Sequence, residues 1–350
     1  MLALPKKWAQ DMGLKQGDKV MIAKQNNTSL VVMARNSPTG ASVEKKADVV
    51  IDPASCKEDM GQVLRRIISY YLKGYSRIDI AVAGGGRLTS TQRTVIKELV
   101  RRCLMGTEII SDSHEVISLQ VLLGHAQLNV QDAIKRMYLI TASMHSDAIR
   151  ALSSRDHDLS DNVARNDDDV DRFSFYIMRQ LEIALQGEVD YSSLGLGADA
   201  DLLRYMLVVN VVERIADLAC KIAADSTKIK EPVDDYLVAR IRRLSESATG
   251  FVADSILALF EEDYNTADRV IRATRMFASE MEKDLAVIEK NEGLAKSPAS
   301  IPARIVLIFE SIKRTAQHAS EIAEVVLNMT VEKPQVQTAT VAEKVALAAR

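Results

Sequence analysis

The sequence predicts a mostly α-helical protein: a bundle of two tandem three-helix repeats, preceded by a small β-rich module and a small α/β region. The main observation is a stretch that occurs twice. Residues 147–165 (DAIRALSSRDHDLSDNVAR) return 107 residues later as 254–272 (DSILALFEEDYNTADRVIR), and residues 213–223 (ERIADLACKIA) return as 313–323 (KRTAQHASEIA) at an offset of 100. Because the offsets differ by only seven residues, both halves share one plan with a single insertion or deletion.

The composition agrees with a helical protein of more than one domain. The chain has 350 residues, of which 47% are hydrophobic and only 5% aromatic, a balance that favours helix-on-helix packing over a β-sandwich. Its three cysteines are far apart and odd in number, which is typical of a reducing, cytoplasmic setting. No run approaches about 18 apolar residues, so no membrane insertion is expected.

The first 125 residues read as two small modules. Residues 1–35 contain a short helical stretch up to Met12 and two strands, 19–23 and 29–33, that flank Asn26-Asn27 as a hairpin. Residues 36–47 read as a linker. Residues 48–125 form a small α/β region, with its predicted strands at 49–51, 78–82, 108–110 and 116–119 and its predicted helices at 57–73 and 90–105.

Six long helical stretches follow, separated by breaks rich in Asp and Ser or in Gly and Pro. They are predicted at 129–153, 157–186, 199–226, 232–261, 265–291 and 302–328. Residues 126–228 and 229–330 are then the two repeats, and residues 331–350 are a flexible tail.

Two carboxylates on the third helix of the first repeat form a candidate metal site. Asn210, Glu213 and Asp217 are spaced three and four residues apart, which places them on one helix face. Carboxylate oxygens on adjacent turns suit hard cations such as Mg, Ca or Mn and can also bind Fe or Zn. The alternative interpretation is an exposed acidic face, with Glu213 paired to a neighbouring Arg or Lys.

A second group of acids lies in the preceding helix. Residues 156–171 hold seven aspartates and one basic residue, Arg165, and four of the seven crowd into 167–171 (DDDVD). Like charges on one helix repel, so a counter-charge would relieve the strain. The alternative is a helix start with Asp167 as N-cap. The predicted metal ligands are Asp168, Asp171, Glu213 and Asp217, with the identity of the ion left open.

The second repeat differs at this site. Lys313 and Gln317 stand where the first repeat has Glu213 and Asp217. Any metal is therefore expected in the first repeat only.

No arrangement typical of catalysis is recognisable. The run Ala83-Gly84-Gly85-Gly86 resembles a phosphate-cradling turn, but no Gly-Lys-Ser/Thr follows it, and an ordinary loop with Thr89 or Ser90 as N-cap is the simpler interpretation. The chain also lacks a convincing set of nucleophile, base and oxyanion hole. We therefore do not expect an enzyme.

These motifs resemble those of a known family. The paired repeats, with DDVDR at 168–172 and ERIADLACKIA at 213–223, look like the PhoU family of phosphate-uptake regulators. The N-terminal LPKKW at 4–8, with Gly13-Leu14, Gly17-Asp18 and Val20, resembles the SpoVT/AbrB-type swapped-hairpin DNA-binding domain. Fused in this order, they are similar to an archaeal PhoU-like regulator.

The resemblance implies a non-enzymatic regulator of phosphate uptake. It implies a bundle that docks on a transporter ATPase or a sensor kinase, and an N-terminal module whose Lys6, Lys7 and Lys15 contact DNA phosphates. A module of 35 residues without cysteines needs further surface to bury its apolar side chains, so a homodimer is expected. The alternative is that residues 48–125 supply this cover, which would allow a monomer. The sequence starts at Met1, which leaves almost no first strand before Leu4, so either the true start lies upstream or DNA binding is impaired.

The sequence departs from the family pattern in one further respect. The family holds iron or zinc clusters through acidic pairs in both repeats, whereas here only the first repeat keeps such a pair. Two other functions remain open. One is a metal-dependent enzyme that uses the acidic site of the first repeat, and the other is a plain helical scaffold with a solvated acidic face.

Overall fold

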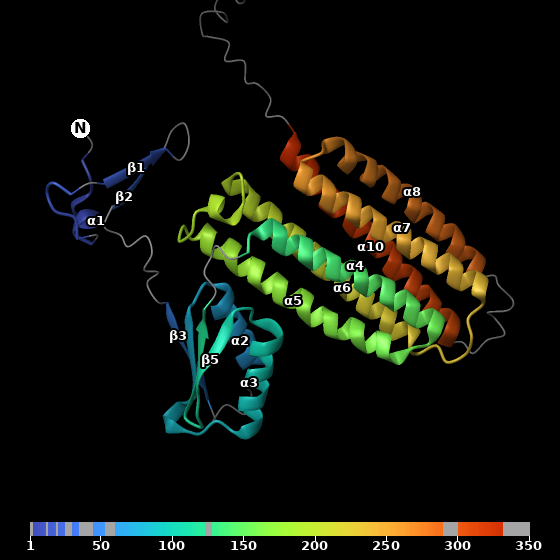
Figure 1. Cartoon of the computed structure of the whole chain (residues 1–350), viewed down its shortest axis with the longest axis horizontal. Helices are drawn as coiled ribbons and strands as arrows, with labels where there is room; N and C mark the ends of the chain where they lie inside the picture. Colours follow the sequence, from blue (N-terminus) through green and yellow to red (C-terminus); the bar gives the residue numbers. More distant parts are fainter. Residues whose placement is uncertain are drawn as a thin grey trace, which may run out of the picture. The chain divides into compact units, whose positions relative to one another are not determined.

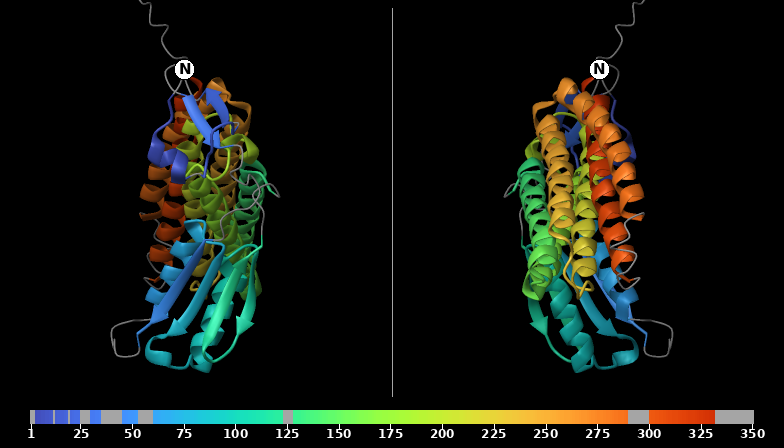
Figure 2. Two further views of the ribbon diagram at one scale, coloured as in Figure 1. Left: turned by 90° about the vertical axis from the view of Figure 1, so that its left-hand side faces the viewer. Right: turned by 90° about the vertical axis from the view of Figure 1, so that its right-hand side faces the viewer.

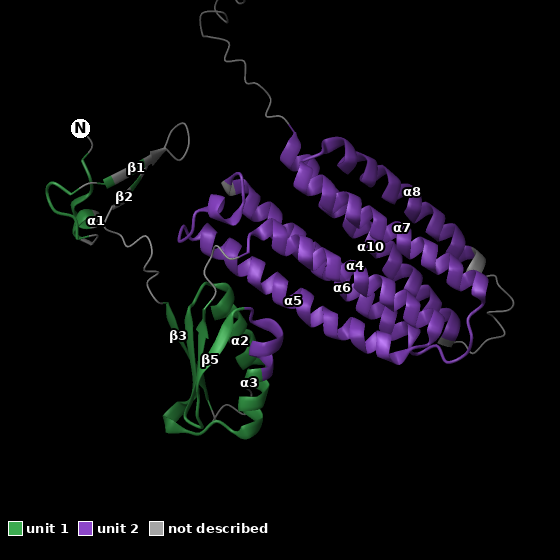
Figure 3. Cartoon of the chain, in the orientation of Figure 1, with its two compact units in different colours: residues 1–97, 106–122 green, residues 98–105, 123–350 purple. Residues whose placement is uncertain are grey.

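The structure is a computed structural model. It describes residues 3–11, 13–18, 20–24, 30–34, 45–52, 60–122, 128–289 and 300–331. The chain divides into two compact units, one of residues 1–97 and 106–122 and the other of residues 98–105 and 123–350 (Figures 1 and 3). The predicted linker at 36–47 and the predicted tail at 331–350 lie almost wholly outside the described residues.

The N-terminal module is a short helix followed by a two-stranded hairpin. Helix α1 (Lys6–Asp11) is followed by the antiparallel strands β1 (Val20–Lys24) and β2 (Leu30–Ala34). In the turn between helix and hairpin, the backbone N–H of Lys15 donates to the carboxylate of Asp18 at 2.7 Å. Both strands of the hairpin begin and end one residue later than predicted.

A four-stranded sheet forms the rest of this unit. Its order is β3-β4-β6-β5, with β3 and β4 parallel and the other two pairs antiparallel. The α2 helix lies between the two parallel strands in sequence, as a parallel crossover requires. The elements are β3 (Lys46–Ile51), α2 (Met60–Leu72), β4 (Arg77–Val82), the 3₁₀ turn η1 (Ala83–Gly85), α3 (Ser90–Cys103), β5 (Thr107–Asp112) and β6 (Val116–Val121). Strand β3 begins inside the range predicted as linker.

The glycine-rich loop before α3 is an ordinary helix start. The N–H of Gln92 donates to the Thr89 hydroxyl at 3.2 Å, and the N–H of Thr89 donates back to the Gln92 side chain at 2.9 Å. This reciprocal pair is a capping box, and it satisfies two backbone donors at the helix N-terminus. Gly84 and Gly85 have positive φ, which explains the need for glycine there. The N-cap interpretation is confirmed.

The described residues of the second unit include six long helices. Figures 1 and 2 show them lying side by side, with α4, α5 and α6 in one group and α7, α8 and α10 in the other. Their bounds are α4 (Val130–Ser154), α5 (His157–Leu185), α6 (Asp199–Ser226), α7 (Asp235–Glu261), α8 (Tyr264–Glu289) and α10 (Ser300–Thr330), with the 3₁₀ turn η2 (Tyr191–Leu194) between α5 and α6. Each end lies within three residues of its prediction, and the predicted fold class is confirmed.

One apolar core runs through all six helices. It includes Ile134 on α4, Val212 on α6, Ile256 on α7 and Phe309 on α10, all buried. Within the described residues, no helix is both long enough and apolar enough to cross a membrane.

Buried polar bonds connect the first and third helices of each repeat. In the first repeat, His145 Nε2 on α4 lies 3.0 Å from the carbonyl oxygen of Ile215 on α6. In the second, Ser255 Oγ on α7 donates to the carbonyl of Ala319 on α10 at 2.8 Å. Each bond satisfies polar atoms that burial removes from water.

Candidate functional site

The acidic residues of the first repeat meet along one side of α5 and α6. On α5, Asp167 and Asp171 are one turn apart, and on α6 Glu213 and Asp217 are one turn apart, so each pair lies on one face of its helix. All four side chains are half-buried. We call these four residues the carboxylate cluster.

The acidic residues lie beside buried positions of both helices. On α5, Val163, Val170 and Ser174 are buried, and on α6, Val212 and Ala216 are buried. This packing fixes the rotation of each helix about its axis. The acidic faces are therefore held in place by apolar packing rather than by attraction between them.

The carboxylates of the cluster are close enough to raise one another's pKa values. Burial, followed by the negative charges of Asp167, Glu213 and Asp217, raises the pKa of Asp171 to about 7. Burial and the charge of Asp217 also raise the pKa values of Asp167 and Glu213. The protein thus keeps carboxylates together at a cost in free energy that a cation would reduce.

A cysteine continues the acidic face of α6. Cys220 follows Glu213 and Asp217 at helical spacing, and its thiol lies 3.9 Å from the carbonyl oxygen of Val163. Burial and then the charge of Asp167 raise the pKa of Cys220 to about 12. This thiol stays protonated at neutral pH, so it is a poor nucleophile.

Asp168 has a different partner from the one predicted. Its carboxylate accepts two hydrogen bonds from the guanidinium of Arg102, at 2.8 and 2.5 Å. Arg102 lies near the C-terminal end of α3, and this end of the helix, within residues 98–105, is part of the helical unit, whereas the start of α3 belongs to the first unit. Asp167, which is outside the predicted set, takes the place expected of Asp168 beside Glu213 and Asp217. The predicted ligands Asp171, Glu213 and Asp217 are brought together.

Hard carboxylate oxygens of this kind suit Mg, Ca or Mn, but their arrangement is not that of a finished metal site. In the part of the chain that the structure describes, no group of three or more His, Cys, Asp or Glu side chains converges closely enough to hold a metal ion. The cluster therefore supplies negative charge rather than a ready coordination sphere.

The second repeat has no matching cluster in its described residues. Lys313 stands at the position of Glu213 and Gln317 at that of Asp217. Thr274, at the position of Asp167, is buried, and its hydroxyl donates to the carbonyl of Ile271 at 3.0 Å. The acidic face is thus a property of the first repeat alone.

The predicted DNA-contacting lysines lie in the other unit. Lys6 and Lys7 are exposed on α1, and Lys15 is exposed in the turn that follows. The three side chains lie within ten residues of each other at the start of the chain.

The chain is similar to known proteins in its helical part. Residues 134–226 match the family model described as the PhoU domain. The crystal structure of PhoU from Pseudomonas aeruginosa has a TM-score of 0.52 and 20% sequence identity, covering 57% of this chain and 94% of that one. The structure of the phosphate transport system regulatory protein PhoU from Streptococcus pneumoniae has a TM-score of 0.46 and 16% identity, covering 58% of this chain and 94% of that one. No curated protein sequence matches.

The PhoU domain match spans most of α4, all of α5 and all of α6, and so contains the whole carboxylate cluster. The first repeat of this chain is therefore similar to the PhoU domain, and its six-helix unit has the fold of PhoU from Pseudomonas aeruginosa.

Proposed function

We propose that this protein is a non-enzymatic regulator of phosphate uptake, whose six-helix unit docks on a transporter ATPase or a sensor kinase. The observation that supports this most is the PhoU domain match over residues 134–226. The fold shared with PhoU from Pseudomonas aeruginosa agrees with it. Because a fold alone does not determine a function, the domain match has the greater weight.

The carboxylate cluster is the proposed functional part of the bundle. Its negative charge is concentrated on one half-buried face, where the pKa of Asp171 reaches about 7. A cation bound there would keep the carboxylates ionised. The metal site remains a prediction, with Asp167, Asp171, Glu213 and Asp217 as the residues nearest to such an ion.

We propose a second role for the N-terminal module in binding DNA as a homodimer. Its exposed lysines, Lys6, Lys7 and Lys15, would contact the phosphate backbone, a type of contact that positions a protein on DNA without reading its sequence. Ile22 on β1 is 52% exposed in the single chain, so a second copy of the hairpin would bury apolar surface.

Phosphate uptake in cells tests the regulatory role. We expect a strain without this gene to lose control of uptake when phosphate is abundant, and the intact gene to restore it. A gene carrying Asp167→Asn and Asp171→Asn should restore it poorly. Asp169→Asn is the matched control, because Asp169 is exposed on the same helix and outside the cluster.

Unchanged phosphate uptake in the deletion strain would contradict the regulatory role. Full rescue by the Asp167→Asn/Asp171→Asn gene would be compatible with the regulatory role. It would show, however, that the carboxylate cluster has no part in that role. Each result bears on a separate part of the proposal.

A further inference from the structure

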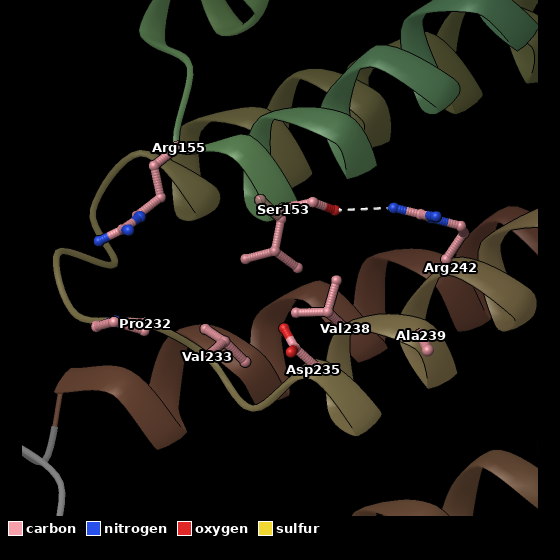
Figure 4. Close-up of a pocket in the computed structure, with 9 residues that line it drawn as sticks. Ser153, Arg155, Pro232, Val233, Asp235, Val238, Ala239 and Arg242 are labelled. Atoms are coloured by element: carbon pink, nitrogen blue, oxygen red, sulfur yellow. Dashed lines mark hydrogen bonds between the residues drawn. The ribbon is translucent and has the colours of Figure 1, made fainter.

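Two adjoining cavities lie at one end of the bundle, where the turn between α4 and α5 meets the segment between α6 and α7. The first has a volume of about 330 Å³ and is shown in Figure 4. The second has a volume of about 550 Å³. Both are lined by Arg155. A volume of this order is enough for a small metabolite, since ligand sites begin at about 300 Å³.

The lining of these cavities is rich in positive charge and hydroxyl groups. Arg155 and Arg242 line the first cavity, and Arg155 and Lys230 line the second. Among the described lining residues, Asp235 alone carries a carboxylate. The hydroxyl-bearing residues are Ser153 in the first cavity and Ser154 and Thr227 in the second.

These cations lack the partners that other arginines of the bundle have. Arg155, Lys230 and Arg242 form no ion pair with any described residue, whereas Arg150 lies 3.0 Å from Asp147 and Arg204 lies 2.9 Å from Asp201. An excess of positive charge around a cavity attracts anions.

The nearby aspartates are engaged elsewhere. Asp156 accepts the N–H of Asp158 at 2.9 Å as the N-cap of α5. Asp234 accepts the N–H of Tyr236 at 2.9 Å as the N-cap of α7. Their charges are directed at helix N-termini, whose free N–H groups they satisfy. They are therefore not the counter-ions of the cavity cations.

The second repeat shows that the turn does not need its basic residues. Residues 153–157 (SSRDH) correspond to residues 260–264 (FEEDY) at the offset of 107. Arg155 and Glu262 share a left-handed conformation, with φ of 55° and 52°, and each closes its helix by donating its N–H to a carbonyl one turn back. The same backbone conformation is thus adopted by a positively charged residue in one repeat and by a negatively charged residue in the other. The turn itself therefore does not require an arginine.

We propose that these adjoining cavities bind a phosphoryl group. Guanidinium groups donate paired hydrogen bonds that match phosphate oxygens. Ser153 Oγ accepts from Arg242 at 3.2 Å and donates to the carbonyl of Ile149 at 3.1 Å, so it helps to hold the Arg242 guanidinium at the cavity wall.

The apolar lining of the first cavity indicates which chemical group could be attached to the phosphoryl group. Val233 and Val238 line this cavity together with the two arginines (Figure 4). Leu152 also belongs to its lining, so part of the wall is apolar. Such a wall suits the body of a phosphate monoester, while inorganic phosphate would use the cations alone. The inference does not rest on the regulatory role, because the cavities share no residue with the carboxylate cluster.

Calorimetric titration of the full-length protein tests this site. The probes are adenosine monophosphate, adenosine and inorganic phosphate, so that the phosphoryl group and the apolar body are varied separately. The variant is Arg155→Gln/Arg242→Gln, for which we expect at least tenfold weaker binding. The matched control is Arg243→Gln, because Arg243 is an exposed neighbour on α7 that lines neither cavity, and it should bind within twofold of the wild type.

A second variant guards against misfolding. Arg155→Glu copies Glu262, which the same turn accepts in the second repeat, so it should melt like the wild type and still lose binding. Tighter binding of the monophosphate than of inorganic phosphate would support the site with an ester as its ligand, and equal binding would support it with phosphate itself. No binding of either anion would overturn the proposal. So would adenosine binding as tightly as its monophosphate, or undiminished affinity in both Arg155 variants.

Discussion

The ammonium nitrogen of Lys313 on α10 lies 3.2 Å from a carboxylate oxygen of Glu282 on α8. Lys313 is the counterpart of Glu213, so the second repeat has an ion pair between its second and third helices where the first repeat has neighbouring acids. Among the described residues, Glu213 and Asp217 of the first repeat have no such ion pair to the neighbouring helix. This contrast leads directly to a prediction about metal content.

Metal should be associated with the first repeat only. In Glu213→Gln/Asp217→Asn, two carboxylates of the cluster become neutral, and we expect the purified protein to lose its metal. The control is Lys313→Gln/Glu282→Gln, which changes the equivalent region of the second repeat and should leave the metal content as it is. Elemental analysis by mass spectrometry is the measurement. Equal metal in the wild type and the first variant would exclude this site.

Removing one charge from the carboxylate cluster should stabilise the metal-free protein at alkaline pH. Asp171 has its pKa raised to about 7 in the folded state, so the folded protein holds this proton more tightly than the unfolded chain does. The contribution of Asp171 to stability is therefore greatest at a pH below about 4, and it is lost as the pH rises through about 7. Asp171→Asn should abolish this loss and gain roughly 1–2 kcal/mol at pH 8, allowing for solvent screening.

The measurement is urea unfolding in the presence of a chelator at pH 5 and pH 8. Asp169→Asn is the control, because Asp169 is exposed on the same helix. If both variants change with pH as the wild type does, the carboxylates are too well solvated to repel each other.

The opposite pH dependence is expected from His145. Burial lowers the pKa of this residue to about 4, although its hydrogen bond to the carbonyl of Ile215 acts in the other direction. As the pH falls from about 6.5 to about 4, His145 becomes protonated in the unfolded chain but stays neutral in the folded protein. The unfolded state is therefore favoured, and stability is lost. The full effect is roughly 2–3 kcal/mol.

His145→Gln should flatten the stability profile between pH 6.5 and pH 4. Glutamine keeps a donor for Ile215 and does not titrate. His114→Gln is a suitable control, because the His114 side chain is 54% exposed. Thermal melting across this pH range gives the answer, and parallel profiles for the wild type and His145→Gln would refute the assignment.

DNA binding should depend on the lysines of α1. Lys6→Ala/Lys7→Ala is expected to weaken binding similarly for all sequences. It should also lower the slope of log affinity against log salt by about one for each lost contact. The control is Lys73→Ala, since Lys73 is exposed but lies outside the N-terminal module. Titrations at several salt concentrations measure the slope, and a wild type that binds no DNA at low salt would rule out this role.

Self-association should depend on the same module. We expect light scattering to give a dimer for the full chain and a monomer for a chain that begins at Lys45, just before β3. Ile22→Lys should also weaken the dimer, because it places a charge on the apolar side of the hairpin. If the full chain and the shortened chain are both monomers at micromolar concentration, the swapped-hairpin assignment fails together with the dimer.

The bounds of the long helices could be predicted closely because residues at the helix ends give local sequence signals. Asn129, Asp156 and Asp234 each precede a helix and accept a backbone N–H at its N-terminus. The hairpin and the strands of the sheet were also indicated by local patterns. The order β3-β4-β6-β5 was not, since it depends on pairing between residues distant in sequence.

The membership of the carboxylate cluster was harder to predict. Adjacent residues on a helix differ by about 100° in direction, so the choice between Asp167 and Asp168 depends on how the apolar face of α5 packs. Both aspartates stand at a spacing from Asp171 that is compatible with one face. Only the tertiary structure shows that Asp168 accepts from Arg102 while Asp167 lies by the charge of Asp217.

The continuous core shared by all six helices means that the two repeats are no longer separable parts. The stretch that matches the PhoU domain, 134–226, contains buried residues such as Val212 and Ile222 whose core extends to Ile256 and Phe309 beyond it. A chain cut between α6 and α7 would expose that apolar surface to water. Each repeat thus covers apolar surface of the other, so the second repeat is needed for the stability of the first even though it carries Lys313 and Gln317 in place of the acidic pair.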